Sequence, residues 1–115
     1  MVYQNCLALR LSGIEVPFER EKSLAVEYLG KVVGKFRADF ICFGTILVEL
    51  KAQTSLSRSD VAQLANYLAA TRQPLGILLN FGATSLEFQR VIGCHALKTY
   101  PEDALPSNSN LWASH

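Results

Sequence analysis

The stretch from Lys35 to Lys51 reads KFRADFICFGTILVELK and predicts two neighbouring β-strands joined by a tight turn. Residues 35–43 and 46–52 are rich in aromatic and β-branched side chains, which favour strands. Gly44-Thr45 between them is typical of a hairpin turn. Both predicted strands are apolar enough to lie in the centre of a sheet, yet each contains charged side chains, and these require a specific explanation.

The charged residues of interest are Asp39 in the first strand and Glu49 and Lys51 in the second. Side chains alternate between the two faces of a strand, so Glu49 and Lys51 share one face. Val48 and Leu50 share the other. A hairpin with this turn brings Asp39 alongside Glu49. Two carboxylates and an ammonium group on a buried sheet lose hydration, and a divalent cation would offset that loss.

The residues before this hairpin predict a helix followed by exposed strands. Residues 2–11 have apolar side chains at helical spacing, and Ser12-Gly13 is typical of a helix end. Residues 14–29 combine Val, Phe and Tyr with alternating charge, which favours one or two half-exposed strands. Residues 29–31, Leu-Gly-Lys, predict a tight turn into the strand that ends near residue 43.

The residues after the hairpin predict a second helix and a buried strand. Ser57 suits the N-cap, and Asp60 falls in the first turn, where a negative charge favours the helix dipole. This helix is expected to end near Thr71. Residues 75–81 form a continuous apolar run that suits a strand buried on both faces, and residues 85–90 predict a short helix. The predicted order is helix, three strands, helix, strand.

Length and composition predict one globular domain. A chain of 115 residues with 50% hydrophobic and 18% charged side chains can bury a core and is unlike a disordered protein. We expect this domain to occupy residues 1–100, and residues 101–115, where Pro, Ser and Asn dominate, to form a flexible tail. The net charge of +1 gives no global signal for nucleic acid.

The sequence also lacks the patterns of membrane or exported proteins. No run approaches the ~18 apolar residues of a membrane span, and the first residues lack the basic-then-apolar pattern of a signal peptide. Cys6, Cys42 and Cys94 are widely spaced and odd in number, which favours buried thiols over a disulfide framework or a zinc site. We therefore expect a cytoplasmic protein without membrane contact.

Taken together, these residues resemble the PD-(D/E)XK nuclease superfamily, whose core has the same αβββαβ order. That core carries an Asp on one central strand and Glu-x-Lys on the next. Within the superfamily, the chain is similar to a small bacterial group, the GxxExxY proteins. Five stretches carry the resemblance: Val2-Tyr3-Gln4-Asn5, Arg37-Ala38-Asp39, Val48-Glu49-Leu50-Lys51-Ala52, Gln63-Leu64-Ala65-Asn66-Tyr67-Leu68 and Pro74-Leu75-Gly76-Ile77-Leu78-Leu79-Asn80-Phe81-Gly82. The resemblance implies a restriction-endonuclease-like α/β fold with helices flanking a central mixed sheet.

The resemblance also implies a nuclease that hydrolyses phosphodiester bonds of DNA or RNA with Mg²⁺ or Mn²⁺. Asp39 and Glu49 supply the hard oxygen ligands that suit Mg²⁺. The resemblance adds the backbone carbonyl of Leu50 as a third protein ligand. Lys51 would orient the attacking water or help to deprotonate it, and hold it against the phosphate.

Two further candidates lie on the predicted second helix. Gln63 and Tyr67 are four residues apart and therefore share one helix face. The resemblance places this face over the sheet. There Gln63 would steady Lys51 or the attacking water, and Tyr67 would bind a phosphate oxygen.

The first helix departs from the family motif. In Gly-x-x-Glu-x-x-Tyr the Tyr corresponds to Tyr3, so the Glu would fall immediately before Met1. Either the sequence starts late relative to its gene, or the protein has lost a carboxylate that its relatives place near the metal.

Simpler interpretations of the same residues stay open. From spacing alone, Glu49 and Lys51 can form a solvated charge pair, and Asp39 can pair with Arg37. Two functions therefore remain: a magnesium-dependent nuclease, and a catalytically impaired protein of the same fold that binds nucleic acid or a protein partner. A homo-oligomer is also left open.

Overall fold

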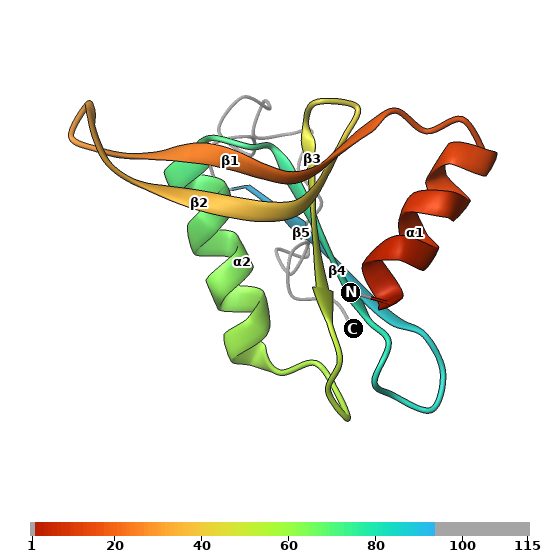
Figure 1. The fold of residues 1–115 in the computed structure, drawn as a ribbon. Helices are drawn as coiled ribbons and strands as arrows, with labels where there is room; N and C mark the ends of the chain where they lie inside the picture. Colours follow the sequence, from red (N-terminus) through yellow and green to blue (C-terminus); the bar gives the residue numbers. More distant parts are fainter. Residues whose placement is uncertain (1, 94–115) are drawn as a thin grey trace, which may run out of the picture.

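The computed structural model describes residues 2–93, which form one five-stranded sheet with a helix on each face (Figure 1). The predicted tail, residues 101–115, lies outside this range. The elements are, in chain order, α1 (Val2–Gly13), β1 (Phe18–Tyr28), β2 (Lys31–Cys42), β3 (Ile46–Lys51), α2 (Arg58–Thr71), β4 (Leu75–Asn80) and β5 (Glu87–Ile92).

The strands follow one another across the sheet in the order β1-β2-β3-β4-β5. β3 and β4 are parallel, and the other neighbouring pairs are antiparallel, so the sheet is mixed. α2 makes the crossover between the two parallel strands, as a βαβ connection requires. This arrangement confirms the predicted αβββαβ order and the mixed sheet flanked by helices.

The prediction of a short helix at residues 85–90 is wrong. Residues Glu87–Ile92 instead form β5, which pairs with β4 over its whole length, from Leu75↔Ile92 to Asn80↔Glu87. Local pattern alone could not reveal this pairing, because β4 provides the hydrogen-bonding groups that fix the extended conformation. The buried side chains Gln89 and Val91 alternate with exposed ones, as expected of an edge strand with one covered face.

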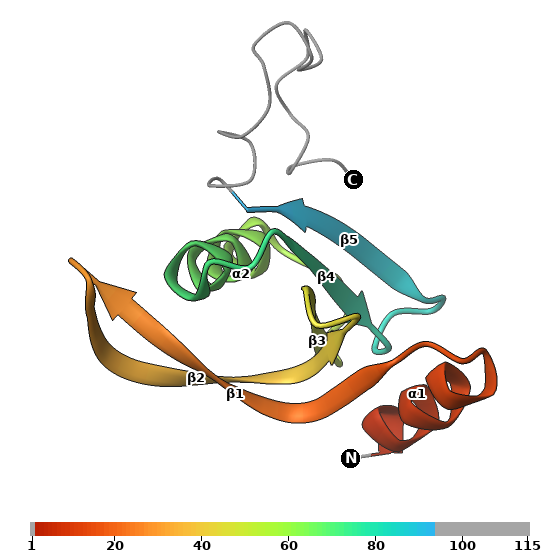
Figure 2. The same ribbon diagram turned by 90° about the horizontal axis from the view of Figure 1, so that it is seen from above.

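Figure 2 shows α1 and α2 on opposite sides of the sheet, and an apolar cluster lies under each helix. Under α2, the cluster of buried residues consists of Ala38, Ile41, Leu47, Leu64, Leu68, Leu78 and Val91. On the other face, Phe40, Cys42 and Val48 pack with partly buried residues that include Leu7, Ala8 and Leu11 of α1. Adjacent residues of β3, Leu47 and Val48, therefore serve different cores, which is the alternation expected of a central strand.

The turn between β2 and β3 has the predicted position. Phe43 and Gly44 both have positive φ, 55° and 71°, and the Thr45 amide donates to the Cys42 carbonyl at 3.1 Å. Positive φ at both central residues matches the twist of a β-hairpin, and Gly44 adopts it without steric cost. This turn sets the register that pairs Phe40 with Val48.

The helix expected from Ser57 is α2, and Ser57 is its N-cap as predicted. The Ser57 hydroxyl accepts from the Asp60 amide at 3.2 Å, and the Asp60 carboxylate accepts from the Ser57 amide at 2.8 Å. This is a capping box, which satisfies donors that the helix itself leaves unpaired. α2 then packs on β4 through Leu64, which lies so close to Gly76 that a Cβ there would meet its side chain at 2.9 Å.

Within residues 2–93, no helix combines the length and apolar character needed to cross a membrane. The expectation of buried thiols holds for Cys42 but is wrong for Cys6, which is exposed on α1. α1 covers the sheet with only one side, and Cys6 lies outside the apolar positions that do so. Cys94 lies outside the described residues.

Candidate active site

The site begins where β2 and β3 separate. The ladder between these strands pairs residues 40–42 with residues 46–48 and then stops. Beyond it, side chains replace the backbone partners. The Asp39 amide donates to Glu49 Oε1 at 3.1 Å, and the Leu50 amide donates to Asp39 Oδ2 at 2.8 Å. The two carboxylates are thereby fixed side by side in the opening between the strands.

The neighbouring ladder is interrupted at the same level. β1 pairs Arg20 with Phe40 and Lys22 with Ala38, but Glu21, between them, adopts a φ of 49° and leaves its pairing with Asp39 unmade. A positive φ at a residue other than Gly is uncommon and distorts the strand locally. Asp39 is thus unpaired in the ladder with β1 and in the ladder with β3, and its side chain turns towards β3.

The ionised form of the Glu49 carboxyl is disfavoured in this arrangement. The pKa of Glu49 is raised from its ordinary value of 4.5 to about 7, chiefly by burial and also by the negative charge of Asp39. The hydrogen bond from the Asp39 amide and the charge of Lys51 act in the opposite direction but are outweighed. A nearby cation would favour the ionised form of Glu49, because an opposite charge lowers a carboxyl pKa.

An open pocket of about 220 Å³ lies beside Asp39, which lines it, whereas Glu49 does not. Its lining residues come from α1 and from the ends of two strands: Tyr3, Gln4, Asp39, Leu50, Lys51 and Ala52. The Gln4 side-chain amide donates to Asp39 Oδ1 at 3.3 Å. The Tyr3 ring stacks on Phe81 at a centroid distance of 4.9 Å, which anchors the first turn of α1 to the chain after β4. α1 therefore closes one side of the pocket.

Arg20 lies directly behind this wall of the pocket. Its guanidinium donates to Gln4 Oε1 at 3.2 Å and to Asn5 Oδ1 at 2.9 Å, and its Cζ lies 5.8 Å from the centroid of the Phe40 ring. Neutral amides orient this cation without cancelling its charge. No carboxylate among residues 2–93 forms an ion pair with it.

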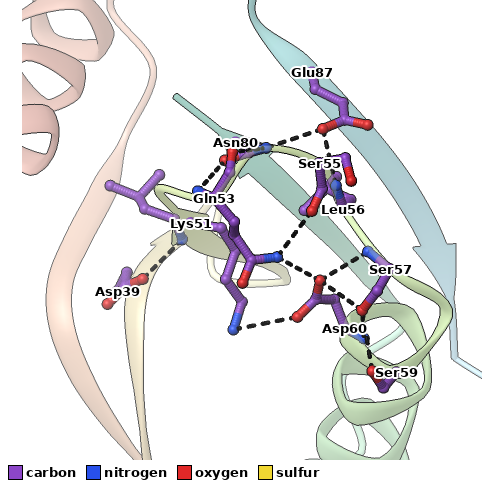
Figure 3. A network of polar contacts seen from close by, with 11 residues as sticks. Asp39, Lys51, Gln53, Ser55, Leu56, Ser57, Ser59, Asp60, Asn80 and Glu87 are labelled. Atoms are coloured by element: carbon purple, nitrogen blue, oxygen red, sulfur yellow. Dashed lines mark hydrogen bonds and ion pairs between the residues drawn. The ribbon is translucent and has the colours of Figure 1, made fainter. Parts of the chain in front are cut away.

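Lys51 extends from the end of β3 towards the start of α2 (Figure 3). Its Nζ lies 3.8 Å from Asp60 Oδ1. The other carboxylate oxygen of Asp60, Oδ2, accepts from the Ser57 amide, the Ser57 hydroxyl and the Gln53 side chain, at 2.8, 2.9 and 2.6 Å. These contacts, led by the Ser57 amide, hold the pKa of Asp60 below its ordinary value, and Lys51 contributes.

Asn80 fixes the loop that follows Lys51. Its fully buried side chain accepts from the Gln53 and Gly82 amides at 2.9 and 3.1 Å. The same side chain donates to the Gln53 carbonyl and to Glu87 Oε1, at 2.8 and 2.9 Å. Gly82 is required here, because a Cβ at this position would overlap the backbone of Gln53. All hydrogen-bonding groups of the buried amide are satisfied, so this loop is held rigidly.

The structure does not bring Gln63 and Tyr67 into contact with the carboxylates or with Lys51. Gln63 is exposed on α2, and its amide has no hydrogen-bond partner within residues 2–93. The Tyr67 ring stacks on Phe36 with centroids 3.9 Å apart, which explains its partial burial. The alternative ion pair between Asp39 and Arg37 does not form in the described structure.

Several polar residues have positions that the sequence did not predict: Gln4, Arg20, Gln53 and Asn80. Gln4 and Asn80 lie within stretches that resemble the nucleases, but no local pattern assigns them a partner. Their partners Asp39 and Gln53 are distant in sequence, so only the fold brings them together. Asp60 was predicted in the first turn of α2, and its part in the capping box and its approach to Lys51 are additional findings.

The donor set fits a hard divalent cation. Among residues 2–93, no group of three or more His, Cys, Asp or Glu side chains is arranged to hold a metal ion. Asp39 and Glu49 provide two carboxylates, and the Leu50 carbonyl lies in the strand between Glu49 and the pocket residue Lys51. Mg²⁺ keeps several waters and is commonly bound through one or two carboxylates, so a small set of oxygen ligands suits it.

Solved structures share this fold. The crystal structure of SSO0001 has a TM-score of 0.60 and 24% identity, over 80% of this chain and 48% of that chain. The alkaline exonuclease LHK-Exo from Laribacter hongkongensis has a TM-score of 0.60 and 10% identity, over 85% of this chain and 58% of that chain. This chain thus spans about half the length of the structures that it matches. At such identities the likeness establishes the fold alone.

A comparison with curated protein sequences finds no match. The family model of the PD-(D/E)XK nuclease superfamily, in contrast, matches residues 1–91. This range includes both helices and all five strands except the last residue of β5. It also includes every residue that lines the pocket. The chain belongs to the PD-(D/E)XK nuclease superfamily.

Proposed function

We propose that this protein is a nuclease that hydrolyses phosphodiester bonds of nucleic acid with Mg²⁺ or Mn²⁺. The observation that carries the proposal is the fixed pair of carboxylates, Asp39 and Glu49, of which Asp39 lines a pocket together with Lys51. Membership of the nuclease superfamily supports it. The two carboxylates repel each other and one is largely buried, which favours a cation as their natural partner.

Asp39, Glu49 and the Leu50 carbonyl would hold the cation. When bound, the cation would offset charge on the scissile phosphate and lower the pKa of a nucleophilic water. Members of the superfamily typically use divalent metal ions. Gln4 would keep Asp39 oriented, because its amide already donates to the Asp39 oxygen that faces α1.

Lys51 would act on the attacking water and on the phosphate. Its ammonium group borders the pocket and carries three donors on a flexible stem. It can therefore orient the water and stabilise the charge that develops on the phosphate in the transition state. Gln63 is exposed and available to the substrate, and Tyr67 keeps a hydroxyl that can donate to a phosphate oxygen although its ring packs on Phe36.

Arg20 supports a polyanionic substrate. It contacts Gln4, which lines the same pocket as Lys51, and its charge is not neutralised by a carboxylate among residues 2–93. We assign it to a backbone phosphate next to the scissile one, because a guanidinium suits phosphate oxygens and carries no base specificity.

The finer family assignment is part of the same proposal. The stretches around Tyr3, Asp39, Glu49-Leu50-Lys51 and Gln63 support membership of the GxxExxY group, and with it a bacterial, cytoplasmic protein. DNA and RNA are both candidate substrates.

A metal-dependent cleavage assay tests this function. The purified protein is incubated with single-stranded and duplex DNA and with RNA, in Mg²⁺, in Mn²⁺ and in EDTA. We expect cleavage with either metal and none in EDTA. Lys51→Ala should remove it, whereas the matched control Lys35→Ala, at an exposed lysine of β2, should retain it.

Equal cleavage by Lys51→Ala and the unmodified protein would indicate a contaminating nuclease and remove the proposal. Binding of the same nucleic acids without cleavage under any metal would favour the alternative, a catalytically impaired nucleic-acid-binding protein.

A further inference from the structure

The two oxygens of the Asp60 carboxylate have different partners (Figure 3). Oδ2 takes part in the cap of α2, where it accepts from the Ser57 amide and hydroxyl, and it also accepts from the Gln53 side chain. Oδ1 makes none of these bonds and lies 3.8 Å from Lys51 Nζ. A residue needed only to cap the helix would have no reason to present its second oxygen to a lysine of another element.

The position of Lys51 requires such a partner. The first turn of α2 carries partial positive charge, which disfavours an ammonium group nearby. An anionic Asp60 within this turn reverses the local field. Its side chain is only 13% exposed and is held by three hydrogen bonds, so it is a fixed anchor rather than a mobile surface partner.

The separation of the two groups also matters. At 3.8 Å the ammonium is attracted to Asp60 Oδ1 but lies beyond hydrogen-bond distance. Its N–H donors therefore stay available for a water or a phosphate oxygen. Lys51 is 27% exposed, so solvent and substrate can reach it.

Hydrogen bonds connect Asp60 both to the start of α2 and to the segment that follows β3. Gln53 donates to Asp60 at 2.6 Å, and the backbone of Gln53 is clamped by buried Asn80 on both its amide and its carbonyl. Gln53 follows Lys51 by two residues. Asp60 is therefore linked both to the start of α2 and to the chain that leaves β3, so its distance from Lys51 is set by the fold.

We propose that Asp60 is a positioning residue that holds the Lys51 ammonium at the pocket for phosphodiester hydrolysis. The proposal rests on the nuclease function proposed above. Asp60 does not touch the substrate; it acts by restricting a side chain with four rotatable bonds, which would otherwise spend little time in a reactive position.

Steady-state kinetics of two variants separate positioning from capping. Asp60→Asn keeps the size and an oxygen for the Ser57 amide but removes the charge facing Lys51. Ser57→Ala removes the hydroxyl of the same cap but keeps the Asp60 charge that faces Lys51, together with the hydrogen bonds to Asp60 from the Ser57 amide and the Gln53 side chain. We expect Asp60→Asn to lower kcat about tenfold, with KM changed less than about twofold. Ser57→Ala should lower Tm but keep kcat.

A double-mutant cycle tests whether Asp60 acts through Lys51. In the Lys51→Met background, Asp60→Asn should have no further effect on residual cleavage, because the side chain that it positions is gone. An unchanged kcat in Asp60→Asn alone, or the same fractional loss with and without Lys51, would overturn the proposal.

NMR supplies a readout that does not require activity. The order parameter of the Lys51 side chain, measured at Cε, should fall in Asp60→Asn and stay unchanged in Ser57→Ala. An equally mobile Lys51 in the unmodified protein and in Asp60→Asn would overturn the positioning role whatever the kinetics show. A protein that cleaves nothing while Asp60→Asn loosens Lys51 would instead overturn the nuclease function, and with it the catalytic purpose of the anchor.

Discussion

Glu49 Oε1 accepts a hydrogen bond of 3.1 Å from the backbone amide of Asp39, at the point where β2 and β3 separate. A side chain thus takes the place of the carbonyl that would continue the ladder. In the reciprocal contact, the carboxylate of Asp39 accepts a hydrogen bond from the Leu50 amide. Backbone donors that the sheet leaves unpaired therefore fix both acids. This explains how the fold keeps two mutually repelling groups beside one pocket.

The first prediction concerns the metal site. Isothermal titration should show Mg²⁺ or Mn²⁺ binding that is lost in Asp39→Ala and in Glu49→Ala, because each variant removes an anionic oxygen ligand. Glu27→Ala, at an exposed position of β1, serves as the matched control and should bind as the unmodified protein does. Unchanged binding in both site variants would exclude a cation at Asp39 and Glu49.

The second prediction concerns the pH dependence of stability without metal. Glu49 titrates near 4.5 in the unfolded chain and at about 7 in the folded one. Between these values the folded protein holds a proton that the unfolded chain has released. The favourable contribution is therefore complete below pH 4.5 and is lost as the pH rises through 7. From pH 5 to pH 8, this group should remove about 2 kcal/mol from the free energy of unfolding.

Urea denaturation in EDTA at several pH values measures this effect. Glu49→Gln, which cannot ionise, provides the reference for all other titrating groups. The loss of stability between pH 5 and pH 8 should be smaller in Glu49→Gln by the amount assigned to Glu49. Identical pH profiles for the two proteins would show that Glu49 titrates normally in the fold. Excess Mg²⁺ should reduce the loss in the unmodified protein, since bound cation favours the ionised carboxylate.

The third prediction separates metal binding from chemistry at Lys51. Lys51→Met keeps much of the side-chain length but removes the ammonium group. Metal affinity should be retained, because Lys51 is not a ligand. Cleavage should fall by about two orders of magnitude or more, as for the loss of one group that stabilises developing charge. A variant that cleaves at the original rate would leave Lys51 without a catalytic role, even if the metal site proves correct.

The fourth prediction concerns Arg20. Arg20→Ala should weaken the binding of a fluorescein-labelled oligonucleotide in EDTA and make that binding less dependent on salt, because one phosphate contact is lost. In cleavage, KM should rise more than kcat falls. Arg37→Ala, another exposed arginine on the neighbouring strand, is the control. Equal weakening by both variants would point to general charge rather than to a phosphate site at Arg20.

The fifth prediction concerns the packing of α2 on the sheet. Leu64 is 1% exposed and fills the space above Gly76, so Leu64→Ala should lower the free energy of unfolding by about 2–5 kcal/mol. Leu86→Ala, at an exposed leucine of the loop before β5, should change it by less than about 0.5 kcal/mol. Urea denaturation provides both values. An unfolding midpoint for Leu64→Ala equal to that of the unmodified protein would contradict this packing.

Signals confined to a few neighbouring residues were enough to predict much of the fold. The alternation along residues 46–51 assigned Glu49 and Lys51 to one face, and the turn at Gly44 set the register that brings Asp39 to Glu49. Ser57 and Asp60 marked the start of α2 through their own hydrogen bonds. In each case the residues that determine the structure are close in sequence, so their pattern is visible before folding.

Only the tertiary structure decided what depends on distant partners. Residues 85–90 became a strand because β4 supplied the hydrogen bonds, which no local pattern contains. Gln4 reaches Asp39 across 35 positions of the sequence, and Arg20 reaches the pocket wall through Gln4. Asp60 could be recognised as a cap from its neighbours, but its second oxygen meets Lys51 because α2 begins beside the end of β3. The sequence by itself determined that Glu49 and Lys51 share one face of a strand and that Asp39 lies alongside Glu49, because these residues are close in the chain. The packing of the helices on the sheet determined which distant side chains contact them.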